Sequence, residues 1–435
     1  MHFLSAGIVF HPMIGDKLKT FLPGLLLVLL GFVVAYQFVD PAPPNTLTFS
    51  AGSKQGVYYA HALAYRDYLK QRGITVHVLE SAGSLENVTR LGKGEADVAF
   101  VQSGIAAPEN SVLSSLGSMY YEPLWVFVRA GSRTRTLNSL KGTVIAVGPQ
   151  GSGTRVLSLQ LLKENGVDES NTTLLPLSGS DAAAALLAGH ADVVFLVAAA
   201  TADTVRQLNG NDKVKLLNFD RAEAYTRRIA TLSGLRLPEG SLDLLTNTPA
   251  QDMKLLAATA TLMVKADLHP ALQDQLMQAA TFVHGGRSLF SVAGEFPTPL
   301  YAGMPLSKEA VRYYKSGPSF LQRYLPFWAA TLVDRLKVML LPFIALLFPL
   351  MKVMPPLYRW RVRSRIYRWY DELNRIDEAL GDGFKQALLD ELESIEADIR
   401  KVHVPLSYAD ELYNLRMHLT LIRKSAEKMK RINHE

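Results

Sequence analysis

Apolar runs alternate with amphipathic stretches between residues 46 and 197, and the alternation occurs twice. In the first copy, β-rich runs are predicted to form strands at 46–51, 75–79 and 97–102, with helices at 58–71 and 85–93. The second copy predicts strands at 143–147, 173–177 and 192–197, with helices at 154–164 and 181–188. Each copy is therefore β-α-β-α-β, which is typical of a parallel sheet with flanking helices.

Three motifs recur at a fixed distance of 95 or 96 positions, at glycines 52 and 148, 83 and 179, and 94 and 189. The third is the clearest, because Gly94-Glu-Ala-Asp-Val-Ala-Phe100 returns as Gly189-His-Ala-Asp-Val-Val-Phe195. The repeat predicts two related lobes, with a cleft where the carboxyl ends of their strands meet. Because Asp97 and Asp192 occupy equivalent positions, we expect them to be structural rather than a catalytic pair.

The expected fold class is α/β, with two lobes of mainly parallel sheet and a cleft between them. We assign residues 46–130 and 230–317 to lobe 1, and residues 131–229 to lobe 2. The alanine-rich run 257–266 is the expected strand that returns to lobe 1.

Two longer apolar segments, 21–39 and 338–357, have roughly the length needed to cross a bilayer. Lys17 and Lys19 precede the first, and five arginines between 359 and 368 follow the second, so the positive-inside rule places both termini in the cytoplasm. A cleaved signal peptide is the alternative for the first segment, and a buried or interfacial helix is the alternative for the second. The flanking parts are a cytoplasmic N-terminus (1–20), a Pro-rich linker (40–45) and a juxtamembrane segment (318–337).

Residues 358–435 form an amphipathic pattern, with leucines and isoleucines at helical spacing on both sides of Pro405. We expect a cytoplasmic helical hairpin. Residues 364–432 of this hairpin could dock a partner or self-associate.

Composition and charge exclude several function classes. The chain contains no cysteine, so thiol chemistry and disulfides are impossible. The net charge of +6 is explained by the arginines beside the apolar segment, which fits membrane topology better than nucleic-acid binding. His61, His77, His190 and His284 lack metal-ligand spacing, and neither G-x-S-x-G nor H-E-x-x-H occurs. We therefore expect no metal, no cofactor and no catalytic residues.

The turns at the predicted cleft carry the candidate ligand-binding residues. Ser152, Gly153 and Thr154 open a helix directly after a strand, an arrangement that favours an anion. Arg155 could pair with a carboxylate or be a solvated first-turn residue. Tyr58 could cover a ligand while Tyr59 packs. Further candidates are Asn87, which could instead be a helix cap, and the pair Gln102 and Ser103 at the end of a buried strand.

These motifs, read in order, resemble the TAXI family, the solute receptors of tripartite ATP-independent periplasmic (TRAP) transporters. The resemblance rests on 52–59, 81–87, 94–103 and 148–154, with Ala310-Val-Arg-Tyr-Tyr-Lys315 further on. It implies a type II periplasmic-binding-protein fold and adds Ser53 and Ser84 to the ligand-lining set. The sequence departs from the family at Lys54, Gln55 and Gly104, which could alter ligand choice.

The same resemblance implies a receptor for a small organic anion, such as a dicarboxylate, a keto acid or an acidic amino acid. The receptor would deliver this ligand to a TRAP-type permease in the bacterial inner membrane, with its binding domain on the periplasmic side. The alternative is a membrane-tethered sensor or scaffold that signals through the C-terminal helices.

Overall fold

The structure is a computed structural model that describes residues 12–37, 41–108, 112–383 and 385–432. The chain separates into two compact units. One unit contains Ala42–Thr331, and the other contains Met1–Pro41 together with Leu332–Glu435. Residues 1–11 of the expected cytoplasmic N-terminus lie outside the described residues.

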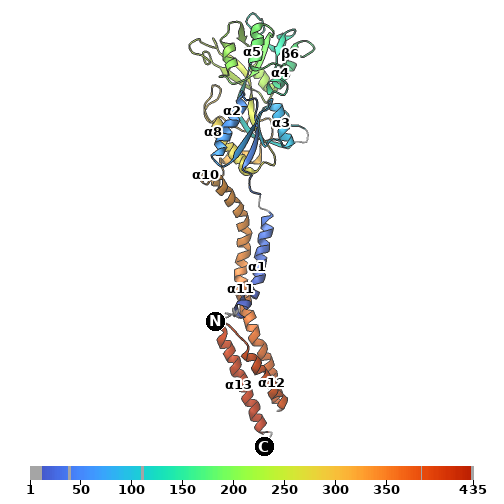
Figure 1. The fold of residues 1–435 in the computed structure, drawn as a ribbon, viewed down its shortest axis with the longest axis vertical. Coiled ribbons are helices and arrows are strands. Elements are labelled where there is room, and N and C mark those ends of the chain that lie inside the picture. Colours follow the sequence, from blue (N-terminus) through green and yellow to red (C-terminus); the bar gives the residue numbers. More distant parts are fainter. Residues whose placement is uncertain (1–11, 38–40, 109–111, 384, 433–435) are drawn as a thin grey trace, which may run out of the picture. The chain divides into compact units, whose positions relative to one another are not determined.

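Lobe 1 is built from the first copy of the repeat (Figure 1). Its elements are β1 (Thr46–Ser50), α2 (Val57–Lys70), β2 (Thr75–Leu79), α3 (Ser84–Lys93) and β3 (Val98–Gln102). β1 pairs in parallel with both β2 and β3. Side chains alternate along β3: Val98 and Phe100 pack with α2 and α8 (Pro270–His284), whereas Ala99 and Val101 pack with α3.

Lobe 2 repeats this arrangement. Its elements are β5 (Val144–Ala146), α4 (Gly153–Glu164), β6 (Thr173–Leu175), α5 (Gly179–Ala188) and β7 (Val193–Val197). β5 pairs in parallel with β6 and β7. The glycines that end α3 and α5, Gly94 and Gly189, both adopt the left-handed conformation, with φ of 74° and 79°. The predicted β-α-β-α-β repeat is confirmed in both copies.

Two long strands join the lobes, and they correct the expectation of mainly parallel sheets. β4 (Leu113–Arg129) and β10 (Met253–Lys265) pair antiparallel with each other. β10 also pairs antiparallel with β3, and β4 with β7. In the described residues the result is one ten-stranded mixed sheet. Eight of its strands follow the order β2-β1-β3-β10-β4-β7-β5-β6, while β8 pairs with β4 and β9 pairs with β10. Local sequence patterns did not reveal this pairing because the two partners lie far apart in the chain.

The remaining elements of this unit surround the two cores. They are η1 (Leu137–Leu140), α6 (Asp203–Asn209), β8 (Val214–Leu216), α7 (Ala222–Arg228), β9 (Ser233–Leu237), α9 (Lys308–Ser316) and α10 (Phe320–Tyr324). β9 pairs with the first half of β10. Leu235 and Leu237 from β9 pack among core residues of lobe 2, so the chain crosses back to lobe 1 within β10 rather than at residue 230.

Asp97 and Asp192 perform the same structural task in the two lobes. Asp97 accepts a hydrogen bond from the Thr48 amide at 2.7 Å and pairs with Lys265 at 2.9 Å. Asp192 accepts from the Val144 amide at 3.0 Å and pairs with Arg129 at 3.3 Å. Each carboxylate thus ties the first strand of its lobe to the end of a crossing strand, and the structural interpretation of both is confirmed.

The other unit contains α1 (Pro12–Tyr36) and most of α11 (Phe327–Gly381). The two helices pack antiparallel. Gly24 faces Leu350, and the Phe32 and Phe343 rings are 5.2 Å apart. Among the described residues, no single helix is both long and apolar enough to cross a membrane. The segments Phe327–Val338 and Phe343–Gly381, which meet at a 45° bend, pass that test together by length and composition.

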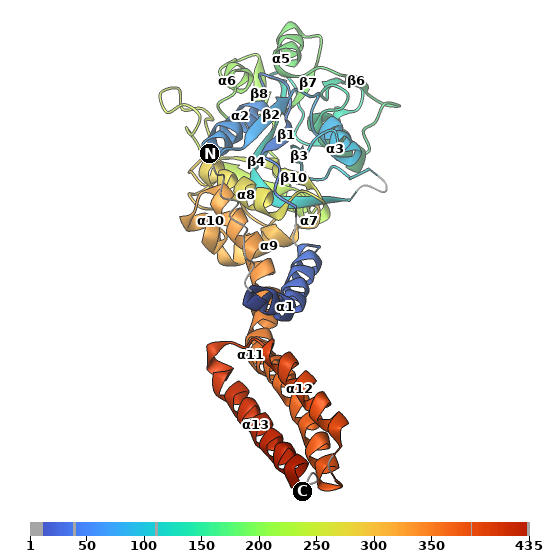
Figure 2. The ribbon, with the colours of Figure 1, turned by 60° about the horizontal axis from the view of Figure 1, so that its bottom comes forward.

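The C-terminal region is a three-helix bundle rather than a hairpin. Figure 2 shows α12 (Gln386–Arg400) and α13 (Ala409–Ile432) beside the last part of α11, with η2 (Leu406–Tyr408) in the connection. Ile366, Leu373 and Leu380 of α11 share one core with residues of α12 and α13. The leucines that suggested docking or self-association therefore pack largely against one another within the chain.

Candidate functional site

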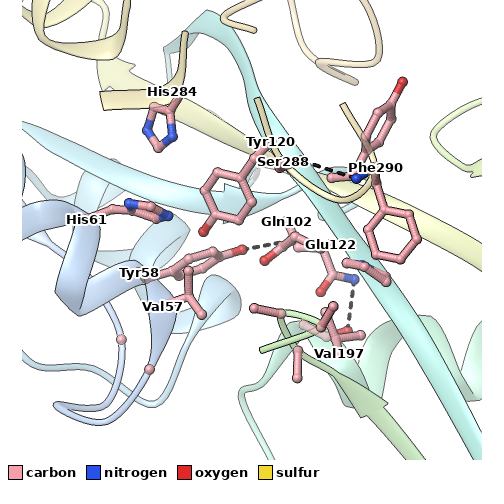
Figure 3. A pocket seen from close by; sticks show the side chains of 18 of the residues that line it. Val57, Tyr58, His61, Gln102, Tyr120, Glu122, Val197, His284, Ser288 and Phe290 are labelled. Carbon is pink, nitrogen blue, oxygen red and sulfur yellow. Dashed lines mark hydrogen bonds between the residues drawn. The ribbon is translucent and has the colours of Figure 1, made fainter. Parts of the chain in front are cut away.

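A cavity of about 440 Å³ lies between the two lobes (Figure 3). Lobe 1 contributes the starts of α2 and α3, the end of β3 and the middle of β4. Lobe 2 contributes the start of α4, the end of β7 and the residues up to 201. The end of α8, residues 286–291 and Phe296 complete the wall. The turns predicted to border a cleft are therefore brought together around one space.

Glu122 is the central polar group of this cavity. Its side chain comes from β4 and is buried. One carboxylate oxygen accepts a hydrogen bond from the Tyr58 hydroxyl at 3.1 Å, and this hydroxyl also lies 3.4 Å from Ser84 Oγ. Burial raises the pKa of Glu122 to about 8, while the hydrogen bond from Tyr58 pulls it down. No lysine or arginine among the described residues forms an ion pair with Glu122.

An aromatic group adjoins Glu122. The Tyr120 ring stacks on His284 with centroids 5.3 Å apart, and the His61 ring lies 4.7 Å from His284 (Figure 3). Burial lowers the pKa of His61 to about 4 and that of His284 well below its usual value, so both rings are neutral at pH 7. Tyr120 Oη and His284 Nε2 are buried without a hydrogen-bond partner in the described residues. The cavity thus presents polar atoms that a ligand could satisfy.

The two lobes touch across the cavity through their turns. The Leu85 amide donates to the Gly151 carbonyl at 3.3 Å, and Gln102 Nε2 donates to the Gly153 carbonyl at 3.2 Å. A Cβ at Gly153 would come within 2.5 Å of Gln102 Oε1, so the close approach requires glycine there. The turns of the two lobes are therefore in direct contact beside the cavity.

The sequence-predicted residues fall into two groups. Seven of them line the cavity: Ser53, Tyr58, Ser84, Gln102, Ser152, Gly153 and Thr154. Three do not: Asn87, Ser103 and Arg155. Asn87 is fully buried in lobe 1, where its Oδ1 accepts from Ser50 and Ser81 and its Nδ2 donates to the Ala51 and Phe100 carbonyls.

Ser103 and Arg155 also bond within the fold. Ser103 Oγ donates to the Thr231 carbonyl at 3.0 Å and accepts from the Thr259 amide at 2.9 Å. Arg155 reaches back to the Gly148 carbonyl at 3.4 Å and lies 3.7 Å from Glu169. Ser152 has a double role, because it lines the cavity and its Oγ also caps α4 by accepting from the Arg155 amide.

Sequence reasoning missed Glu122, Tyr120 and the pair His61 and His284. The histidines are 223 positions apart in the sequence, so their contact depends on the tertiary fold. Glu122 did leave a signal, because it is the only charged residue in the run Leu113–Val128. Burial of a lone carboxylate destabilises the folded state, so a carboxylate in a buried strand points to a functional role.

The described residues contain no group of three or more His, Asp or Glu side chains that could hold a metal ion. The cavity lining offers hydrogen-bonding groups, the carboxyl group of Glu122, the guanidinium group of Arg287 and aromatic rings. Such an arrangement can bind and orient a small polar molecule.

The sequence profile of the NMT1-like family matches residues 49–315, which include both lobes and every cavity residue. This chain belongs to the NMT1-like family. Its fold in this region is two-lobed and mixed α/β. The match ends before most of α11, so the helices of the other unit lie outside the NMT1-like region.

Several solved structures are similar to part of this NMT1-like chain. The alkanesulfonate-binding protein of Xanthomonas axonopodis pv. citri bound to MOPS is 18% identical, with 56% of this chain and 74% of that chain covered and a TM-score of 0.35. The periplasmic aliphatic sulphonate-binding protein of Escherichia coli is 16% identical, with 56% and 73% covered and a TM-score of 0.37. A substrate-binding protein of an amino acid ABC transporter is 16% identical, with 54% and 92% covered and a TM-score of 0.35.

Proposed function

We propose that this NMT1-like protein is an extracytoplasmic solute receptor that encloses a small ligand between its lobes. The observation that carries the proposal is the 440 Å³ cavity bounded by turns of both lobes. Its volume lies within the range of about 300–1,000 Å³ typical of small-molecule sites. Contacts such as Gln102 to Gly153 would form on closure and hold the ligand in place.

The ligand that fits this cavity best is a small organic acid that also carries an amine. Glu122 is a buried carboxyl group without a cationic partner in the described residues, and a ligand ammonium group would supply one. The hydroxyl of Thr154, the start of α4 and the exposed Arg287 at the rim suit a carboxylate. Among dicarboxylates, keto acids and acidic amino acids, we therefore favour amino acids.

The partner implied by the TAXI resemblance is a TRAP-type permease driven by an ion gradient. The motifs behind that resemblance lie where a receptor would need them, since Ser53, Tyr58, Ser84 and Gln102 all line the cavity. Delivery of the ligand to such a permease is the transport role that we propose.

We also propose that α1 and α11 anchor the chain in the inner membrane, with both termini cytoplasmic. α1 exposes apolar side chains along its length, at Leu22, Leu25, Leu26, Leu27, Leu29, Leu30, Val33 and Val34. Residues of α11 such as Ile344 and Phe348 are exposed as well. Apolar surface of this extent is stable in lipid and unfavourable in water. Activity of a periplasm-dependent reporter fused after Glu435 would contradict this topology.

A sensor or scaffold is the second candidate function. The feature that favours it is the three-helix bundle, which an anchored receptor does not need for ligand capture. Tyr413, Met417 and Leu421 remain exposed at helical spacing on α13 and could contact a partner. Association of the bundle with a signalling protein, without any permease partner, would favour this candidate.

A thermal-shift panel on the full-length chain in neutral detergent tests the receptor proposal. Amino acids, dicarboxylates and keto acids are compared at equal concentration. A ligand present at a hundredfold excess over its Kd stabilises the folded state by about 2.7 kcal/mol. We expect an amino acid to raise the melting temperature most. Failure of every compound to shift the melting temperature would contradict a small organic acid as the ligand.

A further inference from the structure

A second cavity, of about 460 Å³, lies within the helical unit, apart from the solute cleft. One wall is the stretch of α11 between Tyr358 and Trp369. The other wall is the end of α12 and the connection that follows it, from Asp398 to Pro405. Both walls belong to the three-helix bundle whose helices are seen together in Figure 2.

The lining of this cavity is strongly basic. Arg365, Arg368, Lys401 and His403 line it, and Asp398 is the one acidic residue among the described lining residues. Asp398 is already paired with Lys401 at 2.9 Å. The positive charge of Arg368 lies over the Trp369 ring, 4.9 Å from its centre, and Arg368 forms no ion pair in the described part of the chain. The cavity therefore has cationic groups in excess of its acidic group.

Trp369 adds an unsatisfied donor. Its indole Nε1 is buried and has no hydrogen-bond partner in the described residues. The indole N–H can only donate, so its missing partner must be an acceptor such as an anionic oxygen. An acceptor bound in this cavity would satisfy the indole and neutralise Arg368 together.

The rest of the wall distinguishes among anions. Tyr358, Val362, Val402 and Pro405 give the cavity an apolar side, and its volume is in the range of small-molecule sites. A bare inorganic ion would leave that side unfilled. An organic phosphate, with its charged group on Arg368 and its carbon skeleton on the apolar wall, uses both parts.

We propose that this cavity binds a phosphate group carried by an organic molecule, and that a membrane lipid headgroup is its source. The lipid source follows from position in the sequence, because the cavity begins at Tyr358, directly after the apolar segment 338–357. Basic pockets at the cytoplasmic end of a membrane helix suit anionic headgroups. The phosphate site itself does not depend on the receptor function. Only the choice of lipid as its source relies on the proposed anchoring.

The test uses the full-length protein in neutral detergent, with short-chain soluble lipids as probes. Dihexanoyl phosphatidylglycerol, dihexanoyl phosphatidylcholine, glycerol 3-phosphate and inorganic phosphate are titrated separately, and binding is followed by calorimetry. We expect saturable binding that is tightest for dihexanoyl phosphatidylglycerol. Equal binding of glycerol 3-phosphate would support the phosphate site and overturn the lipid source. No saturable binding of any probe would overturn the site.

Two variants and a matched control make the result specific. Arg368→Gln should weaken binding about tenfold or more, because a charged hydrogen-bond donor is lost. Trp369→Phe keeps an aromatic ring but removes the N–H, and should weaken binding severalfold. Arg416→Gln makes the same charge change at an exposed site on α13 and should leave binding unchanged. Equal weakening by Arg368→Gln and Arg416→Gln would mean diffuse charge attraction and would overturn the cavity as the site.

The helical content of each variant is checked by circular dichroism, and the thermal shift that the solute induces should be the same as in the wild type.

Discussion

The two lobes share one architecture, but the strand ends that they present at the cavity differ. Asp97 and Asp192 make equivalent bonds, and Gly94 and Gly189 end equivalent helices. The strand ends differ. β3 ends at Gln102 and is followed by Ser103, whereas β7 ends at Val197 and is followed by a run of alanines. The shared aspartates and helix-ending glycines therefore maintain the fold, whereas Gln102 at the cavity has no polar counterpart at the end of β7.

The difference also gives the lobes separate tasks. Lobe 1 supplies Tyr58, Ser84 and Glu122, the connected polar groups of the cavity. Lobe 2 supplies a turn of small residues around Gly153, which can approach Gln102 closely. We interpret lobe 1 as the lobe that recognises the ligand and lobe 2 as the lobe that closes over it.

Asn87 should show the largest effect on stability, because it is an unshared residue that supports the fold of lobe 1. The equivalent stretch of α5 has Ala182 and Ala183. Asn87→Ala would leave several buried groups unsatisfied, including the Phe100 carbonyl, and should destabilise the protein by about 3 kcal/mol or more. The control Thr89→Ala, at a half-buried site on the same helix where the hydroxyl bonds only the Leu85 carbonyl, should have a much smaller effect on stability. Chemical denaturation measures both. A small effect for Asn87→Ala would indicate a binding role instead.

Glu122 should show the next largest effect, this time on ligand affinity. Glu122→Gln keeps the shape of the side chain but removes its charge. It should weaken binding of an amine-bearing ligand by about 2 kcal/mol or more, or roughly thirtyfold. The exposed residue Glu95 on the same lobe provides the control, since Glu95→Gln should leave the affinity unchanged. Calorimetry with the best amino acid from the panel measures the difference, and equal affinities for wild type and Glu122→Gln would remove Glu122 from the site.

The pH dependence of affinity should identify the ligand group that meets Glu122. Because the pKa of Glu122 is about 8 without a ligand, binding an ammonium group near pH 7 requires loss of the proton. Affinity should rise about tenfold per pH unit between pH 6 and 7.5, and level off above pH 8. His61 and His284 stay neutral throughout this window, and burial holds the pKa values of Tyr58 and Tyr120 above it.

The opposite slope would be equally informative. If protonated Glu122 donates a hydrogen bond to a ligand oxygen, affinity should fall as the pH rises towards 8, and the ligand would be a plain acid. In the protein without ligand, stability should decline between about pH 4.5 and pH 8, because the folded state holds the Glu122 proton more tightly than the unfolded state. Glu122→Gln should remove this decline.

The repeat could be predicted from sequence because its signals are local. Glycine turns and short apolar runs fixed the strands to within about two residues in both lobes, as for Thr75–Leu79. The antiparallel pairing of β4 with β10 joins residues more than a hundred positions apart, and neither strand alternates cleanly, because both are buried on two faces. Glu122 lies on β4, so the central group of the site was missed together with its strand.

The C-terminal bundle was mispredicted for a related physical reason. The apolar segment and the amphipathic stretch that follows it both belong to α11, and the helix runs through Pro355 and Pro356 between them. The part beyond the apolar segment therefore supplies a third helix to what the sequence suggested was a hairpin. For Arg155, the sequence left open a ligand carboxylate or solvent as its partner. In the structure its guanidinium group donates to the Gly148 carbonyl of the same turn.

The smallest expected effect concerns the residues that the lobes share, and it tests the comparison most directly. Asp97→Ala and Asp192→Ala should each destabilise the protein by about 1–2 kcal/mol, since each removes the acceptor of a strand amide. Asp97→Ala should lower the free energy of unfolding slightly more than Asp192→Ala, because the Asp97 side chain is 23% exposed and that of Asp192 is 38% exposed. The asparagine variants keep an acceptor oxygen and should cost less. Ligand affinity should be unchanged in all four, because neither aspartate lines the cavity. If one variant lost binding while its counterpart did not, the equivalence of the two aspartates would fail, and with it the inference that these two residues serve only the fold.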